Sequence, residues 1–307
     1  MSAPAGERVG ISPVDRLVAL CEALRPKQWI KNGVLFAGLV FALRLSDPLA
    51  VLQASWAFVV FCAISSAGYL FNDLADVEQD RQHPRKRRRP LASGRITRAQ
   101  TVVFGLVLLL GGLAGAALLG WRFFLLTLGY ALLNFAYNAG LKHVVLIDVF
   151  ALASFFVLRM IAGTVAIDVP ISPWLYICTI LAALFLGLAK RRHELILLGG
   201  DAASHRQILS EYSSELLEQL ITIVTASLVM AYSLYTFSAE NLPRDHSMMV
   251  TVPIVIFGIF RYLYLVHRRE GGGAPEEMLL GDRPLMATVL LLGATWVAVL
   301  YLWGRWL

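Results

Sequence analysis

The sequence predicts an all-α protein that crosses a membrane nine times. Hydrophobic residues make up 58% of the 307 residues and charged residues only 16%, whereas soluble domains carry roughly 25% charged residues. The mean hydropathy is correspondingly high, at +0.66. Apolar stretches recur along the whole chain, and about 20 mostly apolar residues suffice for a helix to cross a bilayer. The predicted spans cover residues 33–46, 50–72, 100–119, 121–139, 144–166, 172–190, 214–238, 247–266 and 285–303.

Positive charge gathers on one side of these spans. If the N-terminus lies in the cytoplasm, the cytoplasmic segments and the adjoining Lys190 hold 21 of the 27 Lys and Arg residues. Cytoplasmic loops of multi-pass proteins are enriched in these residues. We therefore expect a multi-pass protein of the inner (plasma) membrane with a cytoplasmic N-terminus. The net charge of +6 reflects this topology, and no nucleic-acid-binding motif accompanies it.

The first predicted span, residues 33–46, is short and follows two lysines. Lys27 and Lys31 are one turn apart if this part of the chain is an α-helix. They either anchor the chain at the membrane edge or contact a phosphate group, and the sequence leaves both interpretations open.

The second predicted span, residues 50–72, ends in "NDLADVEQD". Asn72, Asp76 and Asp80 are spaced four residues apart and form one column on a helix, with Asp73 beside it. Three carboxylates at this spacing repel one another, but a divalent cation with oxygen ligands holds them together. Mg2+ usually takes one or two carboxylates and keeps substrate phosphates as further ligands. The pattern predicts a site for Mg2+ and a diphosphate, and the alternative is a solvated helix end that neutralises nearby arginines.

A run of cations, "HPRKRRRP" at residues 83–90, follows this acidic motif. Part of the run serves as a topology signal or a contact to anionic lipids. Because the planar fork of arginine binds phosphate through two hydrogen bonds, members of the run near the acids are candidates to hold phosphate oxygens. The candidates are Arg85, Lys86 and Arg89.

The third and fourth spans are separated from the fifth by a short polar turn. Glycines in residues 105–120 permit close packing of the third span against its neighbours.

Tyr137 and Lys142, at the turn before the fifth span, are candidates for contact with phosphate or ribose. Tyrosine is also common at membrane interfaces, so an anchoring role is equally open for Tyr137.

The fifth span, residues 144–166, contains two charged residues. Asp148 lies just inside the span, where it is expected to pair with Lys142 or to line the site. Arg159 lies deeper, and a charge at that depth usually faces a partner or a wet cavity. Both a contribution to the site and a structural ion pair remain open for Arg159.

The sixth span, residues 172–190, ends in a second charged motif, "KRRHEL". Lys190 and Glu194 are one helical turn apart and can form an i,i+4 pair, and Arg191 is a further candidate for phosphate contact. The alternative is a helix-end salt bridge beside arginines that only set topology.

The last three spans complete the layout without further chemistry of their own. Between the last two, "GDR" at residues 281–283 is a candidate cap over the site. The three cysteines and the histidines His143 and His193 have no metal-ligand spacing and are assigned to packing and structure.

The acidic column at the end of the second of nine spans resembles the UbiA superfamily of intramembrane prenyltransferases. In that superfamily such a motif holds Mg-diphosphate, and most members have a second Asp-rich motif at the end of the sixth span. Here that place reads "LGLAKRRHELILLGGD", residues 186–201, with cations instead of an acidic pair. These cations resemble the decaprenyl-phosphate phosphoribosyltransferase branch of the superfamily. Two further stretches, "RPKQWIKN" (25–32) and "APEEMLLGDR" (274–283), are similar to the same branch.

The resemblance implies one transferase domain over residues 1–307, a UbiA-like helical bundle with its active site on the cytoplasmic side. The implied reaction moves a 5-phosphoribosyl group from phosphoribosyl diphosphate (PRPP) to a polyprenyl phosphate, with Mg2+ as cofactor. A homo-oligomer is left open. Catalytic roles are implied for Asp73, Asp76 and Lys190, and metal binding for Asn72, Asp73, Asp76 and Asp80. Substrate contacts are implied for Lys27, Lys31, Asn72, Asp80, Arg85, Lys86, Arg89, Tyr137, Lys142, Arg159, Arg191 and Glu194.

Two other functions fit parts of the sequence. A UbiA-type transfer of a prenyl group to an aromatic acceptor would consume a prenyl diphosphate, and the lack of a second acidic motif speaks against it. A lipid transporter or flippase would show no chemical turnover, and the sparse polar residues deep in the spans disfavour a polar translocation path.

Overall fold

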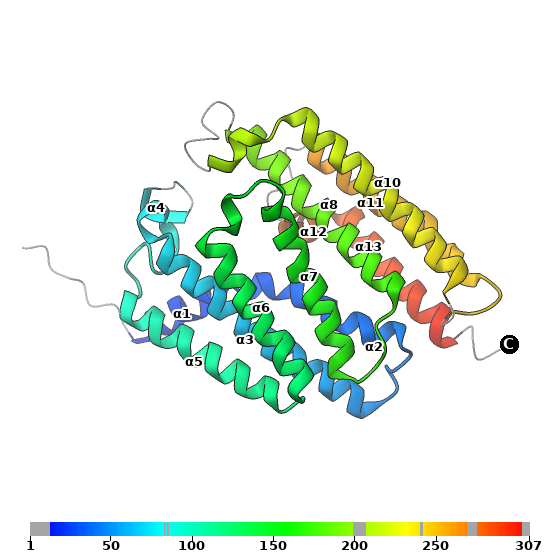
Figure 1. Ribbon diagram of the computed structural model, residues 1–307, viewed down its shortest axis with the longest axis horizontal. Coiled ribbons are helices and arrows are strands. Elements are labelled where there is room, and N and C mark those ends of the chain that lie inside the picture. Colours follow the sequence, from blue (N-terminus) through cyan, green and yellow to red (C-terminus); the bar gives the residue numbers. More distant parts are fainter. Residues whose placement is uncertain are drawn as a thin grey trace, which may run out of the picture.

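Within the residues that the computed structural model describes, the chain is all helical and has no β-strand. The described residues are 13–82, 84, 86–198, 207–239, 242–268 and 275–302. Helices α5 (Arg98–Ala117) and α6 (Trp121–Ala139) lie on one side of the molecule and α10 (Ser214–Ser238) and α11 (Val252–Arg268) on the other. Helices α7 (Ile147–Ala166) and α8 (Pro173–Leu198) pack together between them (Figure 1). The predicted all-α, multi-pass class is therefore confirmed.

Among its described residues, the first half of the bundle contains ten helical elements. They are α1 (Pro13–Ala23), the 3-10 helix η1 (Pro26–Phe36), α2 (Ala37–Phe41), α3 (Pro48–Ala75), α4 (Val77–Gln82), η2 (Lys86–Arg88), α5 (Arg98–Ala117), α6 (Trp121–Ala139), η3 (Leu141–His143) and α7 (Ile147–Ala166). The second half continues with α8 (Pro173–Leu198), η5 (Gln207–Glu211), α10 (Ser214–Ser238), η6 (Ser247–Thr251), α11 (Val252–Arg268), α12 (Pro275–Gly281), α13 (Arg283–Val297) and η7 (Ala298–Leu302).

The predicted count of nine spans is not confirmed. Among the described residues, seven helices are long and apolar enough to cross a membrane. Helix α6 is not one of them, because its 19 residues include Arg122, Asn134 and Asn138. The first predicted span, residues 33–46, is also not one continuous α-helix, because η1 gives way to the short α2, which ends at Phe41.

The 3-10 geometry of η1 determines which side chains enter the bundle. A 3-10 helix has three residues per turn, so residues three apart share a face. Trp29 donates to Ser66 at 3.1 Å, while Asn32 and Leu35 are buried on the same face. Lys27 and Lys31, four residues apart, therefore do not share a face, contrary to the α-helical expectation. Proline at the first position of η1 fits this start, since its backbone has no N–H to donate.

Helix η1 and helix α7 pack backbone against backbone. A Cβ atom added to Gly163 would lie 2.1 Å from the carbonyl oxygen of Leu35, which is far inside contact distance. A Cβ atom on Gly38 would meet Thr164 at 2.8 Å. Only glycine permits this approach, so the N-terminal segment is fixed against the centre of the bundle.

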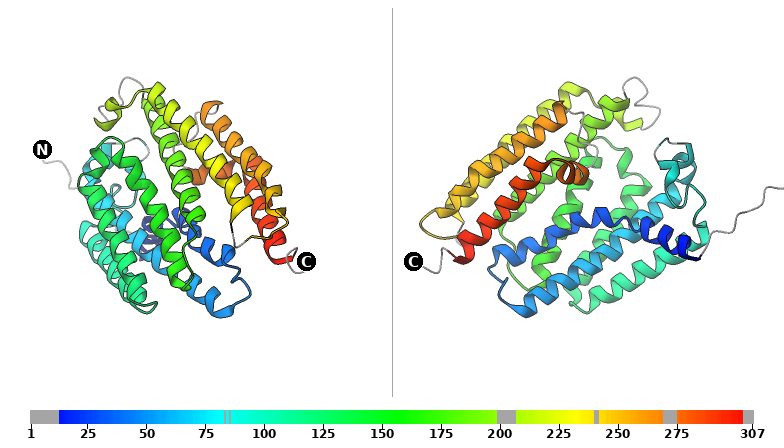
Figure 2. Two further views of the ribbon diagram at one scale, coloured as in Figure 1. Left: turned by 45° about the vertical axis from the view of Figure 1, so that its right-hand side comes forward. Right: turned by 180° about the vertical axis from the view of Figure 1, so that it is seen from behind.

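Apolar side chains fill the interior and also cover the outside. Phe61, Phe123 and Tyr130 pack edge to face within the first half. On the outer surfaces, Leu110 and Ile223 are more than half exposed. A soluble protein rarely exposes so much apolar surface, but a bilayer covers it at no cost. The two views in Figure 2 show the helices running alongside one another in a slanted bundle.

Candidate active site

Segments that are distant in sequence meet at one end of the bundle. The end of α3, helix α4, the turn between α6 and α7 and the C-terminal end of α8 lie at the upper left and top of Figure 1. Most of the charged residues predicted for the site belong to these segments. They form two groups of hydrogen-bonded ion pairs, with a third buried group deeper in the bundle.

The first group, here called the Asp73 cluster, consists of Arg25, Asp73, Asp80 and Arg89. Nη1 of Arg89 lies 3.0 Å from Asp73 and 2.6 Å from Asp80, so a single nitrogen atom joins the two carboxylates. Arg25 forms a further ion pair with Asp73. The two aspartate side chains are only 4% and 2% exposed. Buried carboxylates are stable in a protein when such partners compensate them.

Arg25 was not among the predicted site residues. It lies directly before η1, with the left-handed backbone conformation φ 55°, ψ 60°, which is unusual for a residue other than glycine. Its guanidinium group also lies over the ring of Tyr69, 4.9 Å from the centroid. No local sequence pattern predicts this contact, because Arg25 and Asp73 are separated by 48 positions.

Asp76 takes a different partner from the other two aspartates. It forms the C-cap of α3 and accepts a 3.2 Å hydrogen bond from Lys142 in η3. The predicted column of Asn72, Asp76 and Asp80 is therefore not on one continuous helix, because α3 ends at Ala75 and α4 begins at Val77. The helix breaks at Asp76, and Asp80 instead shares Arg89 with Asp73. Asn72 is half-buried in the last turn of α3.

Taken together, these contacts balance the charge of the acidic motif. Three carboxylates are paired with the three cations Arg25, Arg89 and Lys142. Within the described residues no three Asp, Glu, His or Cys side chains converge as ready metal ligands. The position of Arg89 Nη1 is nevertheless flanked by two carboxylate oxygens, which is the donor type that Mg2+ prefers. The residues thus fit a hard divalent cation if Arg89 yields its place.

The second group, here called the Arg191 cluster, lies between α7 and α8. Arg191 is fully buried and bonds to Asp148 and Glu194, each at 2.5 Å. Its remaining contact is a 3.3 Å hydrogen bond to the hydroxyl of Tyr137. The predicted substrate contact of Arg191 does not agree with this burial. Arg191 instead contacts Glu194 and Tyr137, and Asp148 pairs with Arg191 and not with Lys142.

The neighbours of Arg191 point in different directions. Lys190 is 37% exposed on its side chain and lies 4.0 Å from Glu194, so the predicted pair exists at the outer limit of a salt bridge. Arg192 turns to the other side of α8 and binds Glu218 of α10 at 2.8 Å. Of the "KRR" run, Lys190 is therefore the member best placed to meet a ligand.

The third group, here called the Arg159 cluster, is buried in the bundle. Arg159 is 3% exposed and donates to Asn32 at 2.7 Å and to Tyr130 at 2.5 Å. A third hydrogen bond goes to the carbonyl oxygen of Phe155, and no salt bridge to Arg159 is found among the described residues. The sequence left a structural ion pair open for Arg159, and the described residues do not form one. The guanidinium charge is held by neutral groups and by the ring of Tyr130.

The other predicted site residues are less closely involved. Lys27 and Lys86 are exposed, and Lys31 donates to Gln28 at 2.5 Å. Arg85 lies outside the described residues. Asp282 of the "GDR" segment caps α13 and forms a two-fold hydrogen bond with Arg261, so the structure gives it a local role instead of a cap over the site.

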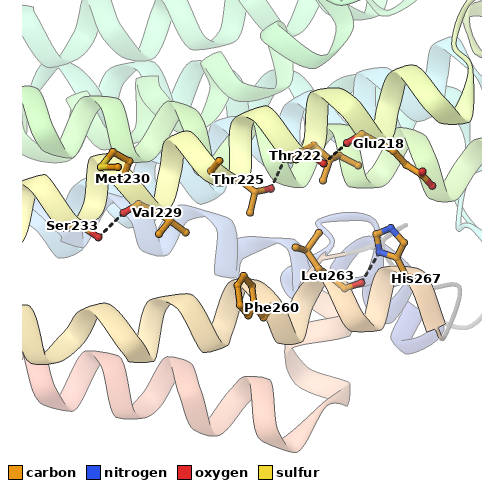
Figure 3. Close-up of a pocket in the computed structure, with 11 residues that line it drawn as sticks. Glu218, Thr222, Thr225, Val229, Met230, Ser233, Phe260, Leu263 and His267 are labelled. Atoms are coloured by element: carbon orange, nitrogen blue, oxygen red, sulfur yellow. Dashed lines mark hydrogen bonds between the residues drawn. The ribbon is translucent and has the colours of Figure 1, made fainter.

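A groove lies between α10 and α11 (Figure 3), and none of its lining residues belongs to the three clusters. Its volume is about 760 Å3, and its lining includes Val229, Phe260 and Leu263. Thr225 and Ser233 donate their hydroxyl hydrogens to their own helix. The groove therefore offers hydrocarbon surface and little hydrogen-bonding capacity. We do not assign the candidate site to it.

The fold and the site define the class as a helical membrane protein with charged residues gathered at one end of the bundle. Residues 33–280 match the UbiA prenyltransferase family, and the chain belongs to this family. It is 34% identical over 292 residues to a decaprenyl-phosphate phosphoribosyltransferase of Mycobacterium tuberculosis, covering 93% of this chain and 94% of the relative. A relative of the same name from Corynebacterium glutamicum is also 34% identical, covering 91% of this chain and 85% of the relative.

The solved structures support the fold. A UbiA homologue from Archaeoglobus fulgidus, solved with GPP and Mg2+, superimposes with a TM-score of 0.72 at 20% identity. The superposition covers 92% of this chain and 99% of the homologue.

Proposed function

We propose that this protein transfers the 5-phosphoribosyl group of PRPP to the phosphate of a decaprenyl-like polyprenyl phosphate and releases diphosphate. The product would be a polyprenyl-phosphoryl 5-phosphoribose, a precursor for cell-envelope glycan synthesis. Two relatives that span most of the chain carry the name decaprenyl-phosphate phosphoribosyltransferase, which supports this substrate pair.

The observation that carries the proposal is the arrangement of opposite charges at one bundle end. Asp76, between the two aspartates of the Asp73 cluster in the sequence, pairs with Lys142, while the end of α8 presents Lys190 where most family members are expected to carry a second acidic motif. A prenyl diphosphate that arrives with its own metal ions suits acids at both places. A lipid monophosphate, which is an anion, suits a cation at the second place.

The acidic residues would hold the metal and the cations would hold phosphate. Asp73, Asp76 and Asp80, with Asn72, are the ligands that fit Mg2+, which when bound supplies positive charge for the departing diphosphate. Arg25, Arg89 and Lys142 then become available for phosphate oxygens. Lys190 would hold the acceptor phosphate.

The reaction requires the two substrates to be positioned more than it requires proton transfer. An oxygen atom of the lipid phosphate forms a bond to C1 of the ribose while the bond from C1 to the diphosphate oxygen breaks. The attacking oxygen is already anionic, so no strong general base is needed. The site must hold two polyanions in line and keep their charges compensated. Direct displacement predicts inversion at C1.

We further propose that the site faces the cytoplasm of a cell with the protein in its inner membrane. The excess of Lys and Arg on that side of the predicted spans supports this orientation. The whole chain would act as one domain, since both halves contribute residues to the site.

The test is a turnover assay on purified protein with radiolabelled PRPP, a polyprenyl phosphate and Mg2+. We expect lipid-soluble label that requires Mg2+ and falls by at least about 100-fold in Asp73→Ala and Asp76→Ala, as for loss of a group that stabilises developing charge. Asp47→Ala is the matched control, because Asp47 caps the opposite end of α3. It should keep its activity.

Two outcomes would overturn the proposal. Consumption of a prenyl diphosphate in the presence of an aromatic acceptor, without labelled lipid from PRPP, would indicate ordinary prenyl transfer. No reaction with either donor would favour a lipid transporter.

A further inference from the structure

Tyr212 joins two segments at the site end of the bundle. It follows η5, and its hydroxyl group accepts a hydrogen bond from the backbone N–H of Leu146 at 2.8 Å. The same hydroxyl donates to Oδ1 of Asp148, also at 2.8 Å. Burial raises the pKa of Tyr212 to about 12, so the hydroxyl keeps the proton that it donates.

The segment around Tyr212 is firmly packed. Ile208 and Leu209 of η5 are 2% and 0% exposed, and Tyr212 is 4% exposed. Ile208 and Tyr212 belong to the same core cluster as Val149 of α7 and Leu188 of α8. Tyr212 is therefore a fixed point to which the turn between α6 and α7 is attached.

One backbone N–H of that turn is bonded by a residue outside the turn. Leu146 is the N-cap residue of α7 and has φ 64°, a conformation that is costly for leucine. Its side chain offers no hydrogen-bond acceptor, unlike the Ser, Thr, Asp or Asn that usually caps a helix. The Tyr212 hydroxyl takes the N–H of this strained residue and holds the second residue of α7 at the same time.

The turn carries one of the cations of the site. Lys142 lies in η3, four residues before Leu146, and its ammonium group contacts Asp76 at 3.2 Å. Asp148 also bonds Arg191, but through its other oxygen atom, Oδ2. Removing the Tyr212 hydroxyl would thus leave the Asp148–Arg191 pair in place and release mainly the turn.

We propose that Tyr212 is a positioning residue that fixes Lys142 against Asp76 by holding the turn between α6 and α7. The substrate group that Lys142 meets is the diphosphate of the donor, a part of the inference that rests on the proposed function. Tyr212 does not contact that group itself.

The experiment compares Tyr212→Phe with Tyr232→Phe. Tyr232 is a matched control, because it is also buried and its hydroxyl also joins two partners, Thr251 at 2.7 Å and Trp296 at 2.9 Å. It lies in the second half of α10, away from the turn. We expect Tyr212→Phe to raise the KM for PRPP about tenfold, the loss typical of one hydrogen bond to a charged group. The KM for the lipid phosphate and the kinetics of Tyr232→Phe should change little.

A double-variant cycle tests whether Tyr212 acts through Lys142. Lys142→Gln combined with Tyr212→Phe should lose no more activity than Lys142→Gln alone, because a displaced turn no longer matters without the ammonium group. Lys142→Gln combined with Tyr232→Phe should instead show the product of the two single effects. Multiplicative losses in the Tyr212 cycle would overturn the inference.

A measurement independent of turnover separates this inference from the proposed function. Backbone hydrogen exchange of residues 140–148 should become faster in Tyr212→Phe and remain unchanged in Tyr232→Phe. If the wild-type protein makes no labelled lipid, the proposed function is wrong. The hydrogen-exchange comparison still tests whether Tyr212 anchors the turn. Unchanged exchange in both variants would overturn the anchoring itself.

Discussion

At the residue scale, the acidic motif is already neutralised by its own cations. Asp73, Asp76 and Asp80 are each paired with at least one of Arg25, Arg89 and Lys142. A metal ion that binds alone would displace the Arg and Lys side chains, and their positive charge would remain beside the metal ion and repel it. A diphosphate that binds alone would attract the Arg and Lys side chains, and the carboxylates left without partners would repel the diphosphate. Metal and diphosphate should therefore bind together.

This coupling is measurable without turnover. We expect Mg2+ alone and inorganic diphosphate alone to raise the Tm of the purified protein only slightly, and the two together to raise it by more than the sum, since binding to the folded state adds stability in proportion to RT ln(1 + [L]/Kd). Asp76→Asn should lower the joint effect. Simple additivity of the two shifts would contradict the interpretation of the ion pairs.

A second prediction at this scale concerns two buried arginines. Arg191→Met leaves Asp148 and Glu194 without their guanidinium partner, and breaking such a pair costs about 3–5 kcal/mol of unfolding free energy. Arg159→Met leaves only neutral groups behind, so its cost should stay within about 2 kcal/mol. Thermal or denaturant unfolding of both variants in the same detergent checks the order. Equal losses would mean that Arg159 has a carboxylate partner after all.

At the element scale, the contact between η1 and α7 should tolerate no side chain. Gly163→Ala places a Cβ atom against the backbone of Leu35, so η1 must shift, at a cost of about 1–3 kcal/mol or more. Gly129 in α6 is the control, because a Cβ atom there would meet nothing within 4 Å. Gly129→Ala should be neutral or gain up to about 1 kcal/mol from helix propensity. Unfolding midpoints of the two variants provide the measurement.

The elements also show what the sequence could and could not predict. Apolar stretches of 20 residues identify α3, α7 and α8 well, because lipid imposes helical hydrogen bonding on any such stretch. The predicted span at 33–46 is not one continuous α-helix, since hydropathy does not distinguish a 3-10 helix from an α-helix. The order of residues placed the acids at the end of α3, but their partners Arg25 and Lys142 come from distant segments. No local sequence pattern predicts the contacts of Tyr212.

At the scale of the whole molecule, the two ends of α3 should lie on opposite sides of the membrane. Ser46 and Ser93 are exposed and lie in the connections before and after this helix. In a variant without native cysteines, an impermeant maleimide added to spheroplasts should label Ser46→Cys, and it should label Ser93→Cys only after lysis. The reverse pattern would invert the proposed orientation and place the site outside the cell.

The three-residue repeat of η1 also limits how its sequence can vary. Trp29, Asn32 and Leu35 contact the bundle at a spacing of three, and the close contact at Gly163 fixes where the series ends. An insertion of one or two residues before Trp29 would leave this face intact, whereas the same insertion between Trp29 and Leu35 would turn the remaining contacts out of the bundle. Even a whole triplet, which keeps the face, would lengthen the helix by about 6 Å and separate one of the two end contacts. Inside this stretch, the chain should therefore accept no gain or loss of length.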